Sequence, residues 1–144
     1  MHNIFFSDAY KEEFDHVFQH KKLFNDPTIY INITSKLDPS HAPDGKENWF
    51  VLINAPSNPD FAWAKEIEKL KVNVVQKLSR ILGKDIGAMI ETEAVLDPGT
   101  IETKTGSYMG SLYGTGSNSP FSAFLRHSNF SGQFRNLYFC GGSV

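Results

Sequence analysis

The chain of 144 residues is poor in cysteine and has no long run of apolar residues. Its single cysteine, Cys140, excludes an internal disulfide and a cysteine-rich metal site, and it favours a reducing, cytoplasmic setting. No stretch approaches the roughly 18 consecutive apolar residues that a membrane-spanning helix needs. The segment from Met1 to Phe6 lacks the basic and apolar regions of a signal peptide. Any contact with the cytoplasmic membrane is therefore expected to be peripheral.

An excess of positive charge is also missing. Lysine and arginine number 14 against 16 acidic residues, which gives a net charge of -2. The basic residues are scattered along the chain, whereas a nucleic-acid-binding surface clusters them. Nucleic acid is therefore not expected as a partner. The histidines of the first half of the chain have no metal-ligand spacing, so no metal site is expected, and neither a Ser-His-Asp order nor a P-loop is present.

Hydrophobic residues make up 40% of the chain and aromatic residues 13%, which is enough apolar material for a real core. Ser7 is predicted to cap a short amphipathic helix over residues 8–18, with one apolar face. That face is formed by Tyr10, Phe14, Val17 and Phe18. Residues 28–34 alternate between isoleucine and polar residues, which indicates a half-buried strand. The apolar run 49–53 predicts a strand buried on both faces. A loop rich in turn formers joins it to the preceding strand, and an antiparallel pair is the simplest arrangement.

The clearest helix is expected in the middle of the chain. Apolar residues recur at intervals of three or four from Trp63 to Ile81, and Gly83 is placed to end the helix in a left-handed conformation. Residues 86–96 are predicted to be extended, with Glu91 and Glu93 solvated. Asp97 followed by proline then predicts a brief helical turn over residues 99–104.

The last third of the sequence is rich in both glycine and aromatic residues. A disordered linker would not contain so many aromatics, so residues 106–132 are expected to be a functional segment or to pack on something outside the chain. The apolar stretch 137–140 is predicted to be a strand, and a Gly-Gly turn follows it. Such a turn lets backbone amides approach a cofactor phosphate, although an ordinary turn is the simpler alternative. Because domains seldom end on such a strand, the chain is expected to be a piece of something larger.

Several phrases of the sequence resemble the C-terminal third of bacterial phytoene desaturases, and the resemblance runs nearly end to end. They are Asn3-Ile4-Phe5-Phe6-Ser7, Glu47-Asn48-Trp49-Phe50-Val51, Gly110-Ser111-Leu112-Tyr113-Gly114, Ala123-Phe124-Leu125-Arg126-His127 and the final segment from Asn136 to Val144. Within the family, the Phe-Leu-Arg-His and Phe-Cys-Gly-Gly-Ser-Val wording is most similar to the carotenoid 3,4-desaturase branch.

The resemblance implies an α+β fold with a mixed or antiparallel sheet backed by helices. This would be the C-terminal portion of an FAD-dependent, amine-oxidase-like flavoprotein. Residues 1–105 would belong to the substrate domain, and residues 106–144 would form the aromatic, glycine-rich segment and the last FAD-side strand. The N-terminal Rossmann domain, with its Gly-x-Gly-x-x-Gly motif, is absent from this sequence. The isolated chain is therefore not expected to bind FAD tightly.

The resemblance also implies candidate binding residues. Gly141, Gly142 and Ser143 would contact the FAD phosphates. Tyr113, Phe121 and Phe124 would line an apolar tunnel for a carotenoid, with ordinary core packing as the alternative. No catalytic residue is assigned, because desaturation by a flavin is hydride chemistry at the cofactor's own ring.

The expected function is that of a C-terminal fragment of an FAD-dependent carotenoid desaturase, acting on phytoene or a hydroxycarotenoid. Its partners would be the carotenoid and the missing FAD domain. Two alternatives remain at this point. The chain is a non-catalytic product of a truncated or split gene that acts as an interaction module, or it belongs to a carotenoid isomerase or oxygenase on the same scaffold.

Overall fold

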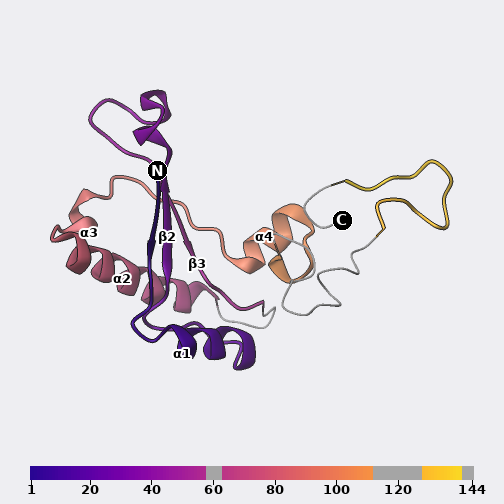
Figure 1. Ribbon diagram of the computed structural model, residues 1–144, viewed down its shortest axis with the longest axis horizontal. Coiled ribbons are helices and arrows are strands. Elements are labelled where there is room, and N and C mark those ends of the chain that lie inside the picture. The colour runs from indigo at the N-terminus through magenta and orange to yellow at the C-terminus, as the bar shows by residue number, and fades with distance from the viewer. Residues whose placement is uncertain (58–62, 112–127, 141–144) are drawn as a thin grey trace. The chain divides into compact units, whose positions relative to one another are not determined.

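The computed structural model describes residues 1–57, 63–111 and 128–140. The chain divides into two compact units, Met1–Val95 and Leu96–Val144. The first unit contains the sheet and the long helix, and the second contains a shorter helix and a small hairpin (Figure 1). The α+β class expected from the sequence is confirmed.

The first unit is built on a three-stranded antiparallel sheet. Strands β1 (His2–Phe5), β2 (Ile29–Ile33) and β3 (Trp49–Ile53) lie in the order β1-β2-β3, so β2 is central (Figure 1). The predicted strands 28–34 and 49–53 and their antiparallel pairing are confirmed. Strand β1 was not expected from the sequence.

One face of the sheet is covered by helix α2 (Trp63–Leu82). The core contains every second residue of β2, because successive side chains of a strand point to opposite faces. Its buried members are Ile29, Ile31, Ile33, Leu78 and Ile86, with Phe5, Trp49, Ile53, Val74 and Val75 packed against them. The predicted helix and the left-handed Gly83, with φ of 63°, are both confirmed.

The first helix differs from its prediction. Helix α1 covers only Tyr10–Phe14 and continues as a π-helix over Asp15–Gln19. Its N-cap is Ala9, without a side-chain capping bond, so the predicted Ser7 cap is wrong. The Ser7 hydroxyl instead accepts from the Ala9 N–H at 3.1 Å and donates to Asp26. The short segment Ser7–Ala9 therefore forms a turn held by Asp26, and the helix begins after it.

The three aromatic residues of the predicted apolar face lie on one side of the helix, as expected, but they are not buried. Val17 is buried, but Tyr10, Phe14 and Phe18 are 47%, 39% and 41% exposed. Together with Phe6 their rings form a row of edge-on and tilted contacts, with centroid separations of 5.8, 4.9 and 5.1 Å. The aromatic residues of this helix therefore pack on one another along its surface.

Two further expectations for the first unit are wrong. Strand β3 is not buried on both faces, because it lies at the edge of the sheet and Phe50 is 56% exposed. Residues 86–96 are not extended throughout, because Ile86–Met89 form the short helix α3. Asp85 caps that helix by accepting from the Ala88 N–H at 3.1 Å.

The second unit begins with helix α4 (Pro98–Thr105), as the sequence predicts. Asp97 caps it by accepting from the N–H and the hydroxyl of Thr100 at 2.9 and 2.7 Å. A 3-10 turn over Tyr108–Gly110 follows. The predicted strand at 137–140 is reduced to a single bridge between Phe130 and Tyr138 within a small hairpin.

In the part of the chain that the structure describes, no helix combines the length and the apolar character that crossing a bilayer requires.

Candidate functional site

The binding residues predicted from the sequence lie outside the described residues. This holds for the proposed phosphate-contacting residues Gly141, Gly142 and Ser143, and for the proposed substrate-lining residues Tyr113, Phe121 and Phe124. They remain predictions.

The described structure contributes an open sheet face. The face opposite α2 displays Ile4, Tyr30 and Leu52, which are paired directly across the three strands in one row. Ile4 is 54% exposed and Leu52 41% exposed. Phe50 lies one pair further along β3 on the same face. The face is therefore largely apolar and accessible in this chain.

One end of this face carries polar groups. The Tyr30 hydroxyl lies 2.6 Å from His2 Nδ1. The next pair of β2 and β3, Asn32 and Phe50, adds an amide at the same end of the face. The face thus combines an apolar centre with a small polar margin, which is the usual composition of a site for an apolar ligand with few polar anchors.

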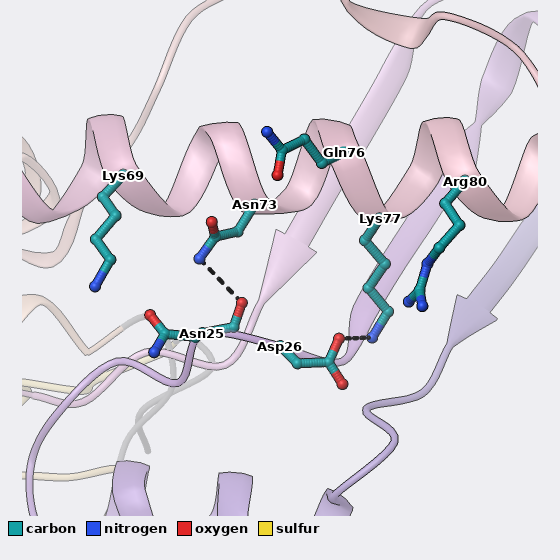
Figure 2. Close-up of a pocket in the computed structure, with 7 residues that line it drawn as sticks. All are labelled: Asn25, Asp26, Lys69, Asn73, Gln76, Lys77 and Arg80. Atoms are coloured by element: carbon teal, nitrogen blue, oxygen red, sulfur yellow. Dashed lines mark hydrogen bonds and ion pairs between the residues drawn. The ribbon is translucent and has the colours of Figure 1, made fainter.

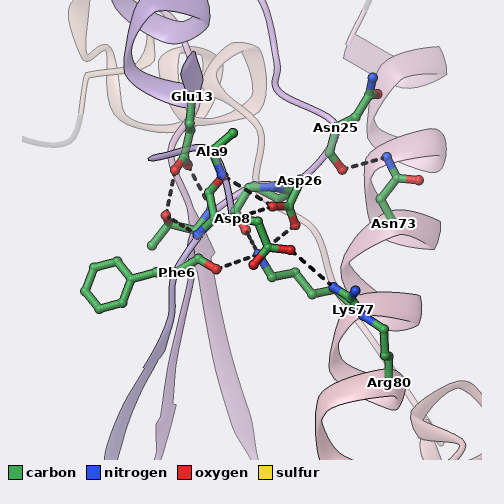
Figure 3. Close-up of polar contacts among 12 residues, drawn as sticks. Phe6, Asp8, Ala9, Glu13, Asn25, Asp26, Asn73, Lys77 and Arg80 are labelled. Carbon is green, nitrogen blue, oxygen red and sulfur yellow. Dashed lines mark hydrogen bonds and ion pairs between the residues drawn. The ribbon is translucent and has the colours of Figure 1, made fainter. Parts of the chain in front are cut away.

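The opposite end of the sheet holds a buried carboxylate. Glu13 of α1 is completely buried and accepts hydrogen bonds from the N–H and hydroxyl of Thr28 at 2.9 and 2.6 Å (Figure 3). It also accepts from Asn54 Nδ2 at 3.1 Å. These bonds join α1 to the beginning of β2 and to the residue that follows β3. Glu13 therefore anchors the helix to the sheet.

A buried lysine lies at the same end of the sheet, where its partners follow β1 and precede β2. Lys77 of α2 donates to the carbonyl oxygens of Phe6 and Pro27 at 2.8 and 2.9 Å, and it pairs with Asp26 at 2.7 Å (Figures 2 and 3). An ammonium group has three N–H donors, so these three oxygens use all of them. Burial by itself would raise the pKa of Asp26. The hydrogen bonds from Lys77 and from the Asp8 N–H outweigh this effect, as does the positive charge of Lys77. The pKa of Asp26 therefore lies below its ordinary value.

A shallow groove of about 470 Å³ opens next to this ion pair. It is lined by Asn25, Asp26, Lys69, Asn73, Gln76, Lys77 and Arg80, and Figure 2 shows Asn73 donating to the Asn25 carbonyl. Because Lys77 and Asp26 already satisfy each other and their neighbours, they are suited to holding α2 on the sheet and not to acid–base chemistry.

The sequence interpretation missed both buried charges, although the sequence carries a signal for each. Lys77 lies three residues after Val74 and seven after Leu70, so it falls within the apolar stripe of α2. Glu13 lies four residues before the buried Val17 and shares its side of the helix. A charged residue at a core-facing position indicates a buried, partnered charge.

The two glutamates expected to be solvated have partners. Glu91 forms an ion pair with Lys46, and Glu93 forms one with Lys71. Both carboxylates remain substantially exposed, so these pairs contribute little to stability. Among the residues that the structure describes, no group of three His, Cys, Asp or Glu side chains is arranged to hold a metal ion.

Comparison with known proteins gives the relationship directly. The chain is 51% identical over its whole length to the 1-hydroxycarotenoid 3,4-desaturase of Flavobacterium sp. (strain P99-3) and spans 30% of that protein. It is 37% identical over 99% of its length to the 4,4'-diapolycopene oxygenase of Methylomonas sp, spanning 29% of it. It is 30% identical over its whole length to the phytoene desaturase of Phycomyces blakesleeanus, spanning 26% of it. No family model matches the chain.

The chain therefore belongs to the carotenoid desaturase family, and it corresponds to a C-terminal part of such a protein. It spans less than a third of the length of the curated relatives described above. The family resemblance seen in the sequence motifs is confirmed.

Proposed function

We propose that the complete protein is an FAD-dependent carotenoid desaturase with an amine-oxidase-like fold, and that this chain supplies part of its substrate domain. The observation that carries the proposal is the 51% identity to a 1-hydroxycarotenoid 3,4-desaturase over the whole chain. The identity to an oxygenase is lower, at 37%. A desaturase is therefore favoured over an oxygenase.

The open face of the sheet supports a role in substrate binding. A carotenoid is a long apolar molecule, and its binding is stabilised by burial of apolar surface at about 25 cal/mol per Å². Ile4, Leu52 and Phe50 supply an exposed apolar surface on one sheet face, while α2 and the core pack on the other face. We assign this face to the wall of the substrate cavity, within the proposed substrate-domain portion 1–105.

The cofactor assignment rests on the sequence. Bound in the complete protein, FAD would supply the acceptor for the hydride that the substrate loses, and the proton lost alongside would pass to solvent. Gly141, Gly142 and Ser143, within the proposed FAD-side segment 106–144, are assigned to its phosphates. Tyr113, Phe121 and Phe124 are assigned to the lining of an apolar tunnel for the carotenoid. The partners are a carotenoid, such as phytoene or a hydroxycarotenoid, and the FAD domain of the complete protein, with peripheral contact to the cytoplasmic membrane.

The test is a product assay on the full-length protein. The purified protein is incubated with a 1-hydroxycarotenoid in lipid vesicles. The products are then separated, and their molecular masses are determined by mass spectrometry. A desaturase yields a product lighter by two hydrogen atoms and absorbing at longer wavelength. A product that gains oxygen identifies an oxygenase, and an unchanged carotenoid with flavin-loaded protein contradicts the proposal.

A further inference from the structure

Strand β3 shows a mismatch between its sequence and its surroundings. Its five residues, Trp49–Ile53, are all apolar, a pattern typical of strands covered on both faces. In this chain, however, Phe50 is 56% exposed and its neighbours Val51 and Leu52 are each 41% exposed. An exposed, apolar edge strand is a strong template for pairing with another strand.

The exposure affects both faces of the strand. Phe50 and Leu52 lie on the open face of the sheet. Val51 is paired with the buried Ile31 and therefore lies on the face that packs against α2. Its exposure shows that the core ends at β3 without a cover. A single ligand on the open face would leave Val51 exposed.

The main chain of β3 also has one outward-facing side. Met1 and Ile33 exchange two hydrogen bonds of 2.9 Å between β1 and β2. Hydrogen-bonding directions alternate along an antiparallel strand, so Tyr30 and Asn32 direct their main-chain groups toward β3. Their partners Leu52 and Phe50 face back toward β2.

It follows that Trp49, Val51 and Ile53 direct their N–H and carbonyl groups away from the sheet. In the part of the chain that the structure describes, no strand lies on that side. The edge therefore offers three regularly spaced positions at which a further strand can form hydrogen bonds.

We propose that β3 pairs with a β-strand from the part of the full-length protein that lies outside these 144 residues. This inference rests on the proposed function only in requiring the longer protein. Relatives that match the whole chain are more than three times as long, since it spans 30% or less of each of them. A second copy of the chain is a poorer occupant. Pairing along a five-residue edge buries far less surface than the roughly 1,200 Å² that a stable dimer needs.

The first test is residue-resolved hydrogen exchange on the full-length, flavin-loaded protein. If an outside strand pairs with β3, the amides of Trp49, Val51 and Ile53 exchange at least about 100-fold more slowly than unstructured peptide, like those of Phe50 and Leu52. A free edge gives an alternating pattern, in which only Phe50 and Leu52 are protected. The alternating pattern would overturn the inference.

The second test is a proline substitution in the full-length protein. Proline is tolerated where a strand N–H faces solvent, but it removes a ladder bond where the N–H is paired. Val51→Pro is therefore expected to lower the apparent Tm by several degrees, and clearly more than Val51→Thr, which keeps the N–H and the branched shape. Phe50→Pro is the positive control, because it breaks the pairing with β2 in either case. An unchanged Tm in Val51→Pro would contradict the inference.

Light scattering separates the possible occupants. Uniform protection of β3 in a monomeric protein supports pairing within one polypeptide. Protection that appears only at concentrations at which dimers form assigns the edge to a second copy and overturns the inference. The product assay is run on the same preparation. Uniform protection without desaturation rejects the proposed function and leaves the strand pairing supported, and the reverse result rejects the pairing alone.

Discussion

Lys77 Nζ lies 2.7 Å from Asp26 Oδ1, and its side chain is only 5% exposed. The same nitrogen also satisfies two main-chain carbonyls, so replacing it leaves three oxygens without their donor. We expect Lys77→Met to lower the free energy of unfolding by about 2–4 kcal/mol. The exposed Lys69 on the same helix provides the control. Lys69→Met is expected to change the free energy of unfolding by less than about 0.5 kcal/mol. Thermal unfolding of the full-length protein measures both, and equal Tm values would contradict the assignment.

The same pair predicts a pH dependence. The pKa of Asp26 in the folded chain is lowered from 3.8, so its ionised form stabilises the fold at every pH above 3.8. That contribution is lost as the pH falls below 3.8 and through the lower folded-state pKa. The difference in Tm between the natural protein and Asp26→Asn is therefore expected to be constant at neutral and mildly acidic pH and to narrow below pH 3.8. A Tm difference that stays constant below pH 3.8 would show that the charge of Asp26 does not stabilise the fold.

Gly110 is predicted to be much harder to replace than Gly106, although both are left-handed glycines of the second unit. Its φ is 68°, and an added Cβ would lie 2.1 Å from the Pro98 carbonyl oxygen. Gly106 has a similar φ of 71°, but an added Cβ would have nothing within 4 Å. Gly106→Ala should therefore cost about 1–2 kcal/mol for backbone strain, and Gly110→Ala should cost more than about 3 kcal/mol.

Limited proteolysis of the full-length protein measures this difference. Gly110→Ala should expose cleavage sites around Pro98–Thr105, the helix packed against this turn, and Gly106→Ala should do so much less. Similar cleavage rates in the two variants would show that the contact between Gly110 and Pro98 is not maintained.

Much of the first unit could be predicted from the sequence. The period of the α2 stripe, the alternation in β2 and the turn-rich loop before β3 are local signals that tertiary contacts reinforce. Gly83 in the first unit and the Asp97 cap in the second were predictable for the same reason, because each satisfies the geometry of a helix end within a few residues.

The failures have a different origin. Ser7 has the composition of a helix cap, but Asp26, distant in sequence, captures its hydroxyl and moves the helix start to Tyr10. Residues 86–89 look extended because the pattern is short, and the Asp85 cap converts them to a helical turn. The exposure of β3 follows from its place at the edge of the sheet, which its own five residues do not reveal. Long-range partners leave no local pattern, and the candidate binding residues lie outside the described part of the structure.

The open sheet face is tested by placing a polar group in its apolar row. Leu52→Asn in the full-length enzyme should weaken carotenoid binding by about 1–2 kcal/mol, which is roughly a 5- to 30-fold rise in KM. Val72 is 50% exposed on α2, away from this face. The matched control is Val72→Asn, for which no change in KM is expected. Product formation at several carotenoid concentrations measures both variants. An equal KM in the two would remove this face from the substrate cavity.

The cofactor assignment leads to a prediction for Gly142. A branched side chain would obstruct the approach of the backbone amides to an anion, so Gly142→Val should reduce flavin occupancy more than it reduces the yield of folded protein. Losing one amide contact to a charged phosphate corresponds to about a tenfold weaker affinity or more. Gly132 is the matched control, because an added Cβ there has nothing within 4 Å and its φ lies outside the left-handed range. The ratio of flavin absorbance to protein in purified full-length samples is the measurement. If Gly142→Val retains the flavin content of Gly132→Val, the FAD phosphate does not bind at this turn. A valine side chain at position 142 would otherwise separate the backbone amides from the phosphate and lower the flavin content.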